Sequence, residues 1–138
     1  MRKILLDTAY IQAIVNRNDE YHQVALQLFP QISSAQEVWI TEAVLIESAN
    51  SLSRIIWEGI YSFIKAVYTE PNVYIVSVSS ELLSQSLDLY ANRLDKTWSL
   101  TDCLSFLVMQ EQGLTEAATS DHHFEQSGFR ALMRNVPS

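Results

Sequence analysis

The sequence has only one cysteine, Cys103, among its 138 residues. No disulfide can form within the chain, so we expect a protein of a reducing compartment, the cytoplasm. Long apolar runs are also missing: after the basic N-terminal residues, the run Ile4-Leu5-Leu6 is interrupted by Asp7. A secretory leader needs roughly 7–15 apolar residues and a membrane span roughly 20, and no stretch reaches either length. We therefore expect a soluble protein that makes no use of a membrane.

Basic residues, glycine and proline are scarce as well. Nine Lys and Arg stand against 16 Asp and Glu, which gives a formal charge of −7. This charge argues against a domain held on nucleic acid by an overall basic surface, but not against an enzyme that meets nucleic acid at a local patch. Three glycines and three prolines predict mostly regular structure, and 48% hydrophobic residues are enough to build one core. We expect residues 1–138 to form one domain.

Short apolar runs alternate with segments of helical periodicity. The runs predict buried strands at 3–7, 37–41, 72–79, 116–120 and 129–134, the last two being the weaker. The periodic segments predict helices at 8–16, 20–29, 42–56, 59–68, 80–95 and 99–113. In the helix at 80–95, Leu83, Leu87 and Tyr90 lie in register on one face. The alternation predicts an α/β fold with a mainly parallel sheet.

Four acidic residues stand just after predicted strands or at the start of a predicted helix: Asp7, Glu47, Asp102 and Asp121. Each also has an ordinary structural interpretation. Asp7 and Asp121 have the positions of helix caps or loop acids, and Asp102 has capping-box spacing from Ser99. Glu47 lies on the polar side of its helix, as a surface residue would.

As a set, the four acids indicate a shared site. Ligands of a parallel sheet collect at the carboxyl ends of its strands, so these side chains are expected to converge. Clustered carboxylates raise one another's pKa unless a cation neutralises them. Oxygen-only clusters suit Mg²⁺ or Mn²⁺, which activate water in phosphodiester cleavage. Thr8, next to Asp7, supplies a hydroxyl that we expect to orient this carboxylate.

The segments "ILLDTAYI", "WITEAVLIESANSLSR", "SLTDCLSFLVMQ" and "ATSDHHF" resemble those of the PIN domain family, in particular its VapC-type ribonuclease toxins. The family pattern has an Asp followed by Ser or Thr, a helical Glu, an Asp that opens a helix and a final Asp after a Thr. Asp7, Glu47, Asp102 and Asp121 match it in order, with Thr8 and Thr119 as the accompanying hydroxyls.

The resemblance implies a three-layer α/β/α domain with a sheet of four to five strands. It also implies endonucleolytic cleavage of RNA by a metal-activated water, with Asp7, Asp102 and Asp121 as Mg²⁺ or Mn²⁺ ligands. Glu47 completes the cluster directly or through a water. A cognate antitoxin that covers the site and a homodimer are further expectations. Arg93 and Lys96, upstream of Asp102, are candidate phosphate contacts or ordinary surface charges.

Other interpretations remain at this point. A PIN-like binding module without activity fits the same sequence, whereas a haloacid-dehalogenase-like phosphatase requires an acid at position 9, which is alanine. Tyr10, Tyr21 and Phe29 are either core residues or part of a partner groove. The adjacent His122 and His123 are expected to diverge on a helix and not to chelate one ion together. At most one of them is expected at the rim of the acidic site, in contact with phosphate; the alternative is that both are structural or solvated.

Overall fold

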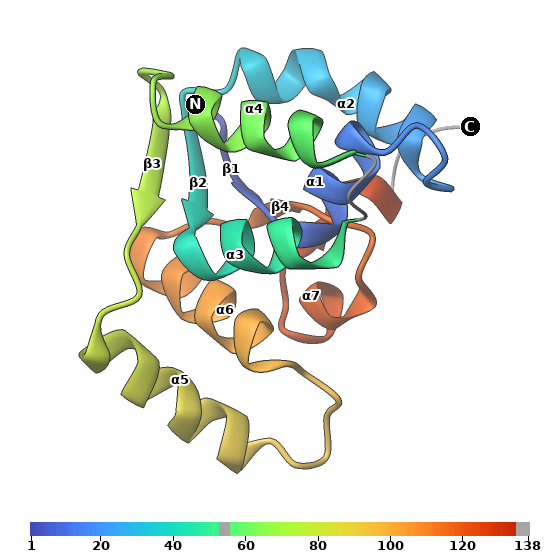
Figure 1. The fold of residues 1–138 in the computed structure, drawn as a ribbon. Helices are drawn as coiled ribbons and strands as arrows, with labels where there is room; N and C mark the ends of the chain where they lie inside the picture. Colours follow the sequence, from blue (N-terminus) through green and yellow to red (C-terminus); the bar gives the residue numbers. More distant parts are fainter. Residues whose placement is uncertain (53–55, 135–138) are drawn as a thin grey trace.

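The computed structural model describes residues 1–52 and 56–134 (Figure 1). Its strands are β1 Lys3–Leu6, β2 Glu37–Thr41, β3 Val73–Val76, β4 Glu116–Ala118 and β5 Arg130–Ala131. Its helices are α1 Thr8–Val15, α2 His22–Ser33, α3 Glu42–Ser51, α4 Trp57–Val67, α5 Ser80–Asn92, α6 Leu100–Gln112, α7 His122–Gln126 and the 3-10 turn η2 Leu132–Arg134. No helix in these described ranges is long and apolar enough to cross a membrane.

The five strands form one sheet in the order β3-β2-β1-β4-β5, and every neighbouring pair is parallel. The predicted α/β fold is confirmed, and the sheet is parallel throughout. From β1 the chain first builds the sheet outward through β2 to β3. It then returns to the other side of β1 with β4. The direction of strand order therefore reverses between β1 and β4, which is where α/β sheets place their ligands.

Helices cover both faces of the sheet because alternate residues of a strand point to opposite sides. Ile4 and Leu6 of β1 pack into a core with residues of α1, α2, α3 and α4. Leu5, between them, packs into a second core with residues of α5, α6 and α7. Figure 1 shows these two helical layers on either side of the strands. The expected three-layer arrangement is confirmed.

Several element boundaries differ from the sequence prediction. The helix predicted at 42–56 ends at Ser51, and residues 53–55 of that prediction lie outside the described residues. The strand predicted at 129–134 has only two residues before the chain turns into η2, where the Met133 N–H donates to the Thr119 carbonyl over 3.1 Å. Helix α5 buries Leu82 and Ser86, and its predicted apolar stripe of Leu83, Leu87 and Tyr90 faces outward.

The three aromatic residues of the first two helices have different environments. Tyr10 is buried in the core, as the core interpretation predicted, and Tyr21 packs against the same core while partly exposed. Phe29 is 45% exposed and lines an apolar groove of about 310 Å³ together with Tyr10. The core role is thus confirmed for Tyr10, and the use of the groove by a partner remains a prediction.

Candidate metal centre

Asp7 follows β1 directly, and the neighbouring strand fixes its position. Parallel pairing sets Leu6 beside Ala118, and the Asp7 N–H donates to the Ala118 carbonyl over 3.2 Å. The hydroxyl of the next residue, Thr119, donates to Asp7 Oδ2 over 2.8 Å. Asp7 is 5% exposed and Thr119 is fully buried. Asp7 occupies the N-cap position of α1, but its side chain makes no capping hydrogen bond.

Burial raises the pKa of Asp7 from 3.8 to about 7, because an ionised carboxylate loses its hydration in the interior. The hydrogen bond from Thr119 acts in the opposite direction. The negative charges of Asp102 and, more weakly, Asp121 raise the pKa further. The three carboxylates are therefore near enough to repel one another. A cation among them would relieve both the burial penalty and the repulsion.

Asp102 opens α6 at the same edge of the molecule. Ser99 and Asp102 form the predicted capping box: Ser99 Oγ accepts from the Asp102 N–H, and Asp102 Oδ2 accepts from the Ser99 N–H, each over 3.0 Å. Asp102 is 6% exposed, and burial raises the pKa of this carboxyl above its ordinary value, with a further contribution from the charge of Asp121. The cap fixes the carboxylate without removing it from the acidic cluster.

Asp121 reaches the cluster from the segment after β4. Its Oδ1 accepts the His123 N–H over 2.9 Å, so it caps α7 as one of the structural interpretations predicted. The Asp121 N–H donates to Thr119 Oγ1 over 3.0 Å. Because the same hydroxyl donates to Asp7, Thr119 links the segments after β1 and β4 at the point where strand order reverses.

Hydrogen bonds hold each of the three aspartates in a fixed orientation. The side-chain hydrogen bonds and ion pairs of the described residues use Oδ2 of Asp7, Oδ2 of Asp102 and Oδ1 of Asp121. The second oxygens of Asp102 and Asp121 take part in none of them, and the Asp7 carboxylate also accepts a hydrogen bond from the backbone of Thr8. Three oriented carboxylates are a suitable ligand set for a hard divalent cation.

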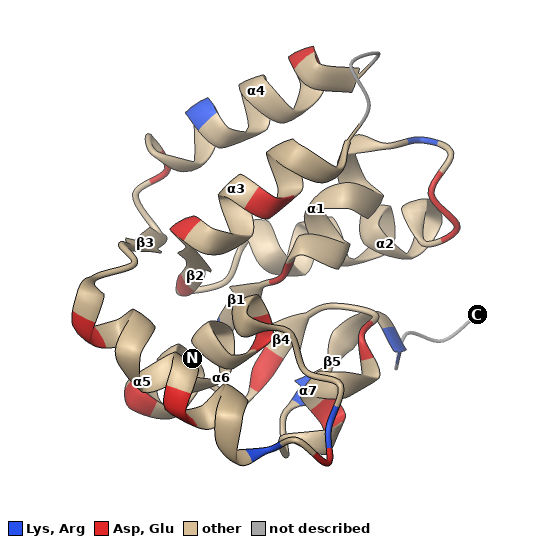
Figure 2. Ribbon diagram, turned by 60° about the horizontal axis from the view of Figure 1, so that its bottom comes forward, with Lys and Arg blue, Asp and Glu red and all other residues tan. Residues whose placement is uncertain are grey.

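Glu47 has a different environment. It lies on α3, whose two acidic positions are visible in Figure 2, and it is exposed. Within the described residues, no hydrogen bond or ion pair joins it to the three aspartates, and it is not among the charges that perturb the pKa of Asp7. The structure thus brings three of the four predicted acids into one electrostatic cluster and places the fourth on a solvent-facing surface.

The hydroxyl of Thr8 does not orient Asp7, contrary to the prediction. Thr8 Oγ1 is buried and has no hydrogen-bond partner, and Thr119 supplies the hydroxyl that holds Asp7. A buried hydroxyl without a partner beside a carboxylate cluster is the kind of group that an ion or its water shell satisfies. Together with the oxygen-only character of the aspartates, it shows that the residues present fit Mg²⁺ or Mn²⁺.

Arg93 and Lys96 lie in the segment between α5 and α6. Both contact Asp95, Arg93 over 3.2 Å and Lys96 over 3.9 Å. The Arg93 guanidinium also lies over the ring of Trp98, 4.9 Å from its centroid. These contacts hold the two basic residues in the segment that leads directly to Ser99 and the start of α6.

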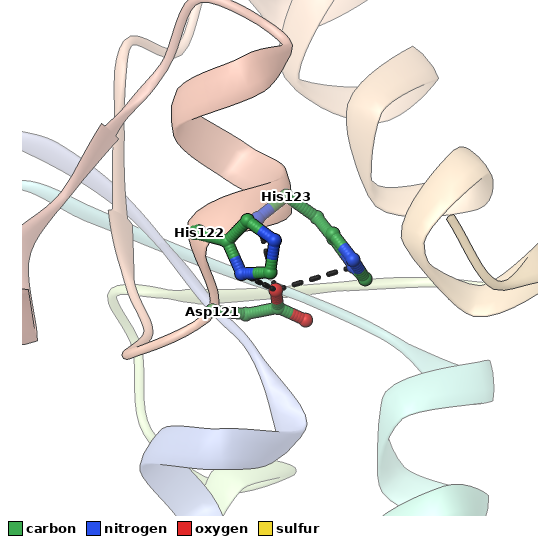
Figure 3. A group of neighbouring side chains, drawn as sticks. All are labelled: Asp121, His122 and His123. Carbon is green, nitrogen blue, oxygen red and sulfur yellow. Dashed lines mark hydrogen bonds and ion pairs between the residues drawn. The ribbon is translucent and has the colours of Figure 1, made fainter. Parts of the chain in front are cut away.

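The histidine pair differs from its prediction. The two rings lie side by side with centroids 4.6 Å apart, and the ligand atoms of Asp121, His122 and His123 lie within 4.8 Å of one another (Figure 3). They do not diverge, because both rings turn back over the Asp121 carboxylate that caps their short helix. His123 also contacts Asp102 over 2.9 Å. Sequence reasoning missed this contact, since it depends on the packing of α7 against α6.

The protein is a three-layer α/β/α domain with one parallel sheet. Carboxylates gather where the strand order of this sheet reverses, and they form an acidic site of the kind that holds divalent cations. The chain belongs to the PIN domain family, whose model matches residues 4–129. It is 26% identical over 126 residues to the 23S rRNA-specific endonuclease VapC20 of two Mycobacterium tuberculosis strains, CDC 1551 / Oshkosh and H37Rv. These alignments cover 91% of this chain and 95% of each relative.

A solved structure supports the same family. The crystal structure of M. tuberculosis VapC20, described as a Sarcin-Ricin loop cleaving toxin, superposes on this fold with a TM-score of 0.81. Sequence identity is 25%, with 91% of this chain and 95% of that one covered. The chain is therefore a PIN domain with distant similarity to VapC nucleases, as the sequence motifs predicted.

Proposed function

We propose that this protein is a metal-dependent endoribonuclease of the VapC toxin type. The observation that carries the proposal is the convergence of Asp7, Asp102 and Asp121, each buried or half-buried and each held by hydrogen bonds. The similar M. tuberculosis proteins are named as endonucleases of 23S rRNA, which supports RNA as the substrate class.

The three aspartates would hold Mg²⁺ or Mn²⁺, with Thr8 and Thr119 beside them. Such an ion, when bound, activates water and stabilises charge on the leaving oxygen of a phosphodiester. Thr119 keeps Asp7 and Asp121 in place through hydrogen bonds of 2.8 and 3.0 Å. Glu47 is proposed to act from farther away, through a water at the open side of the site. The expected products carry a 5′-phosphate and a 3′-hydroxyl.

Arg93 and Lys96 are proposed as contacts for the RNA backbone. Both lie just upstream of the α6 start that carries Asp102, and Arg93 is ordered over Trp98. The protein has a net charge of −7 and therefore few basic side chains for binding RNA. A local pair of basic residues would then contribute a large part of the phosphate binding.

An antitoxin is the proposed protein partner. An apolar groove of about 310 Å³ lies between α1, α2 and α4, and its lining includes Tyr10, Ile14, Phe29, Ile32 and Phe63. A groove with this lining fits the apolar face of a helix. Since α1 begins directly after Asp7, a segment bound there could extend to the acidic site.

The proposed homodimer rests on the outward stripe of α5. Leu83, Leu87 and Tyr90 are 37%, 47% and 46% exposed, and they lie one helical turn apart. An apolar stripe that does not face the core is suited to contact with a second copy.

RNA cleavage by the purified protein tests the proposed activity. A structured RNA is incubated with Mn²⁺ or Mg²⁺, with EDTA, and with the Asp7→Asn and Asp102→Asn variants. We expect cleavage with either ion, none with EDTA, and a loss of at least about 100-fold in each variant. Equal cleavage by wild type and both variants would exclude the mechanism. Metal binding without cleavage of any RNA would favour a binding module instead.

A further inference from the structure

The side chain of His123 connects three separate segments around the acidic site. Its Nδ1 lies 2.9 Å from Asp102 Oδ2 and 3.2 Å from Asp121 Oδ1, the second contact being drawn in Figure 3. Its Nε2 lies 3.0 Å from the hydroxyl oxygen of Thr97, in the segment before α6. The ring therefore bridges the α6 start, the α7 cap and the segment that carries Arg93 and Lys96.

The hydrogen-bond directions follow from the partners. An ionised carboxylate only accepts, so the hydrogen on Nδ1 points toward Asp102 and Asp121. In the neutral ring, the Thr97 hydroxyl then donates to Nε2. In addition, the main-chain N–H of His123 donates to Asp121 Oδ1 over 2.9 Å. One residue thus fixes Asp121 from both its backbone and its ring while it fixes Asp102 through the ring alone.

The geometry preserves the oxygens that a cation requires. His123 contacts Asp102 Oδ2 and Asp121 Oδ1, which are already engaged in the caps of α6 and α7. The other oxygens of both carboxylates stay out of these contacts. The ring also places a donor between two like charges that would otherwise move apart. Its side chain is only 15% exposed, which leaves it little freedom to leave this position.

His122 provides an internal comparison. Its side chain is 57% exposed, and its Nδ1 lies 3.8 Å from Asp121 Oδ1, beyond hydrogen-bond distance. It has no hydrogen bond to Asp102 or Thr97 within the residues that the structure describes. The two histidines are adjacent in the sequence, but only His123 contacts Asp102 and Thr97 among the described residues.

We propose that His123 is a positioning residue of the metal site: its ring sets the separation and orientation of Asp102 and Asp121 before the ion binds. This inference rests on the proposed function. Groups that orient metal ligands typically change metal affinity about 10- to 100-fold when they are removed. Loss of the His123 ring is accordingly expected to weaken Mn²⁺ binding by at least about 10-fold.

Titration of the metal-free protein with Mn²⁺, followed by electron paramagnetic resonance of the free ion, tests this role. The variants are His123→Ala, His123→Asn and His123→Gln, with His122→Ala as the matched control. An asparagine amide nitrogen can replace Nδ1, whereas a glutamine amide nitrogen replaces Nε2. We expect affinity at least about 10-fold weaker for the alanine and glutamine variants, substantial recovery for asparagine, and no change for His122→Ala. Circular dichroism of each metal-free variant checks that it is folded.

Failure of the proposed role of His123 can be distinguished from failure of the proposed function. Wild-type affinity in His123→Ala and His123→Gln, with affinity lost in Asp102→Asn, would overturn the role of His123 alone. Tighter binding in His123→Ala would also overturn it, since the ring would then compete with the ion. If the wild type itself does not bind Mn²⁺, the proposed function fails and the inference fails with it. A similar loss in all three His123 variants would indicate packing of the ring and contradict positioning through Nδ1.

Discussion

At the scale of single residues, Asp7 is a candidate metal ligand whose burial disfavours the ionised form that a metal requires. A carboxyl group that is 5% exposed and has a pKa raised to about 7 is held in a place that disfavours its charge. The folded state binds this proton more tightly than the unfolded state, where the ordinary value of 3.8 applies. Stability of the metal-free protein is therefore greatest below pH 4 with respect to this group, and is lost as the pH rises toward 7.

The variant Asp7→Asn tests directly whether stability falls as the pH rises. Its side chain stays neutral, so at pH 8 and without metal it is expected to be more stable than wild type, by at most roughly 4 kcal/mol. The difference should shrink steadily as the pH is lowered from 7 to 4. Urea unfolding of both proteins in EDTA across this range measures it. If the difference in unfolding free energy between wild type and variant is the same at pH 4 and at pH 7, burial does not raise the pKa of Asp7 as assigned.

The exposed position of Glu47 leads to a different expectation. Glu47→Gln should lower the rate of RNA cleavage less than Asp102→Asn does, because Glu47 is outside the cluster of three aspartates. Its effect on the free energy of unfolding should be within about 0.5 kcal/mol, as for other surface substitutions. Parallel cleavage and urea-unfolding curves of the two variants give both quantities. A loss equal to that of Asp102→Asn would place Glu47 among the direct ligands.

The sequence predicts which residues form the site where their position next to a strand or helix end is enough to identify them. Asp7 and Asp102 stand at a strand end and a helix start, and both features are visible in the order of residues. The pairing of Thr119 with Asp7 required the register of β1 on β4. The contact of His123 with Asp102 required the packing of α7 on α6, which no periodicity encodes.

At the scale of elements, the start of α6 combines a cap with a candidate ligand. Ser99→Ala removes the oxygen that accepts the Asp102 N–H and is expected to cost about 1 kcal/mol of stability. Ser79 makes the same kind of cap on α5, where Ser79 Oγ accepts the Leu82 N–H over 3.1 Å. Ser79→Ala is therefore the matched control.

Both cap variants should lose similar stability, but only Ser99→Ala should also weaken Mn²⁺ binding, because only its partner is a candidate ligand. Thermal unfolding and Mn²⁺ titration of the two variants separate the effects. Equal Mn²⁺ affinity in both variants would show that the capping box contributes stability and nothing to the site.

Most elements were predictable in kind and order, and less so in extent; α7 and η2 are outside the list of predicted helices. Strand positions followed from short apolar runs that two helical layers cover. Helix α5 shows the limit of such reasoning, because a stripe in register identifies one helical face without saying what that face contacts. The packing of α5 on α6 buries Leu82 and Ser86 instead of the stripe. At the early turn of β5 into η2, the Met133 N–H donates to the Thr119 carbonyl, a tertiary contact that no local pattern encodes.

The stripe gives a prediction at the scale of the whole molecule. If it forms the proposed dimer contact, Leu87→Glu should convert a dimer to a folded monomer, because a charge would be buried against the second copy. Gln85→Glu adds the same charge on an exposed part of α5 outside the stripe and should leave the dimer intact. Light scattering coupled to gel filtration measures the mass of each. Equal dimer populations in both variants would exclude the stripe as the interface.

At the scale of the whole molecule, the proposed site depends on where the fold brings three aspartates together. The strand-order reversal between β1 and β4, together with the start of α6, gathers three aspartates that lie far apart in the sequence. Anomalous scattering from a crystal grown with Mn²⁺ tests this claim most directly. We predict one or more strong peaks in contact with carboxylate oxygens of Asp7, Asp102 and Asp121. A peak held only by Asp121, His122 and His123, or no peak near Asp7, would contradict it.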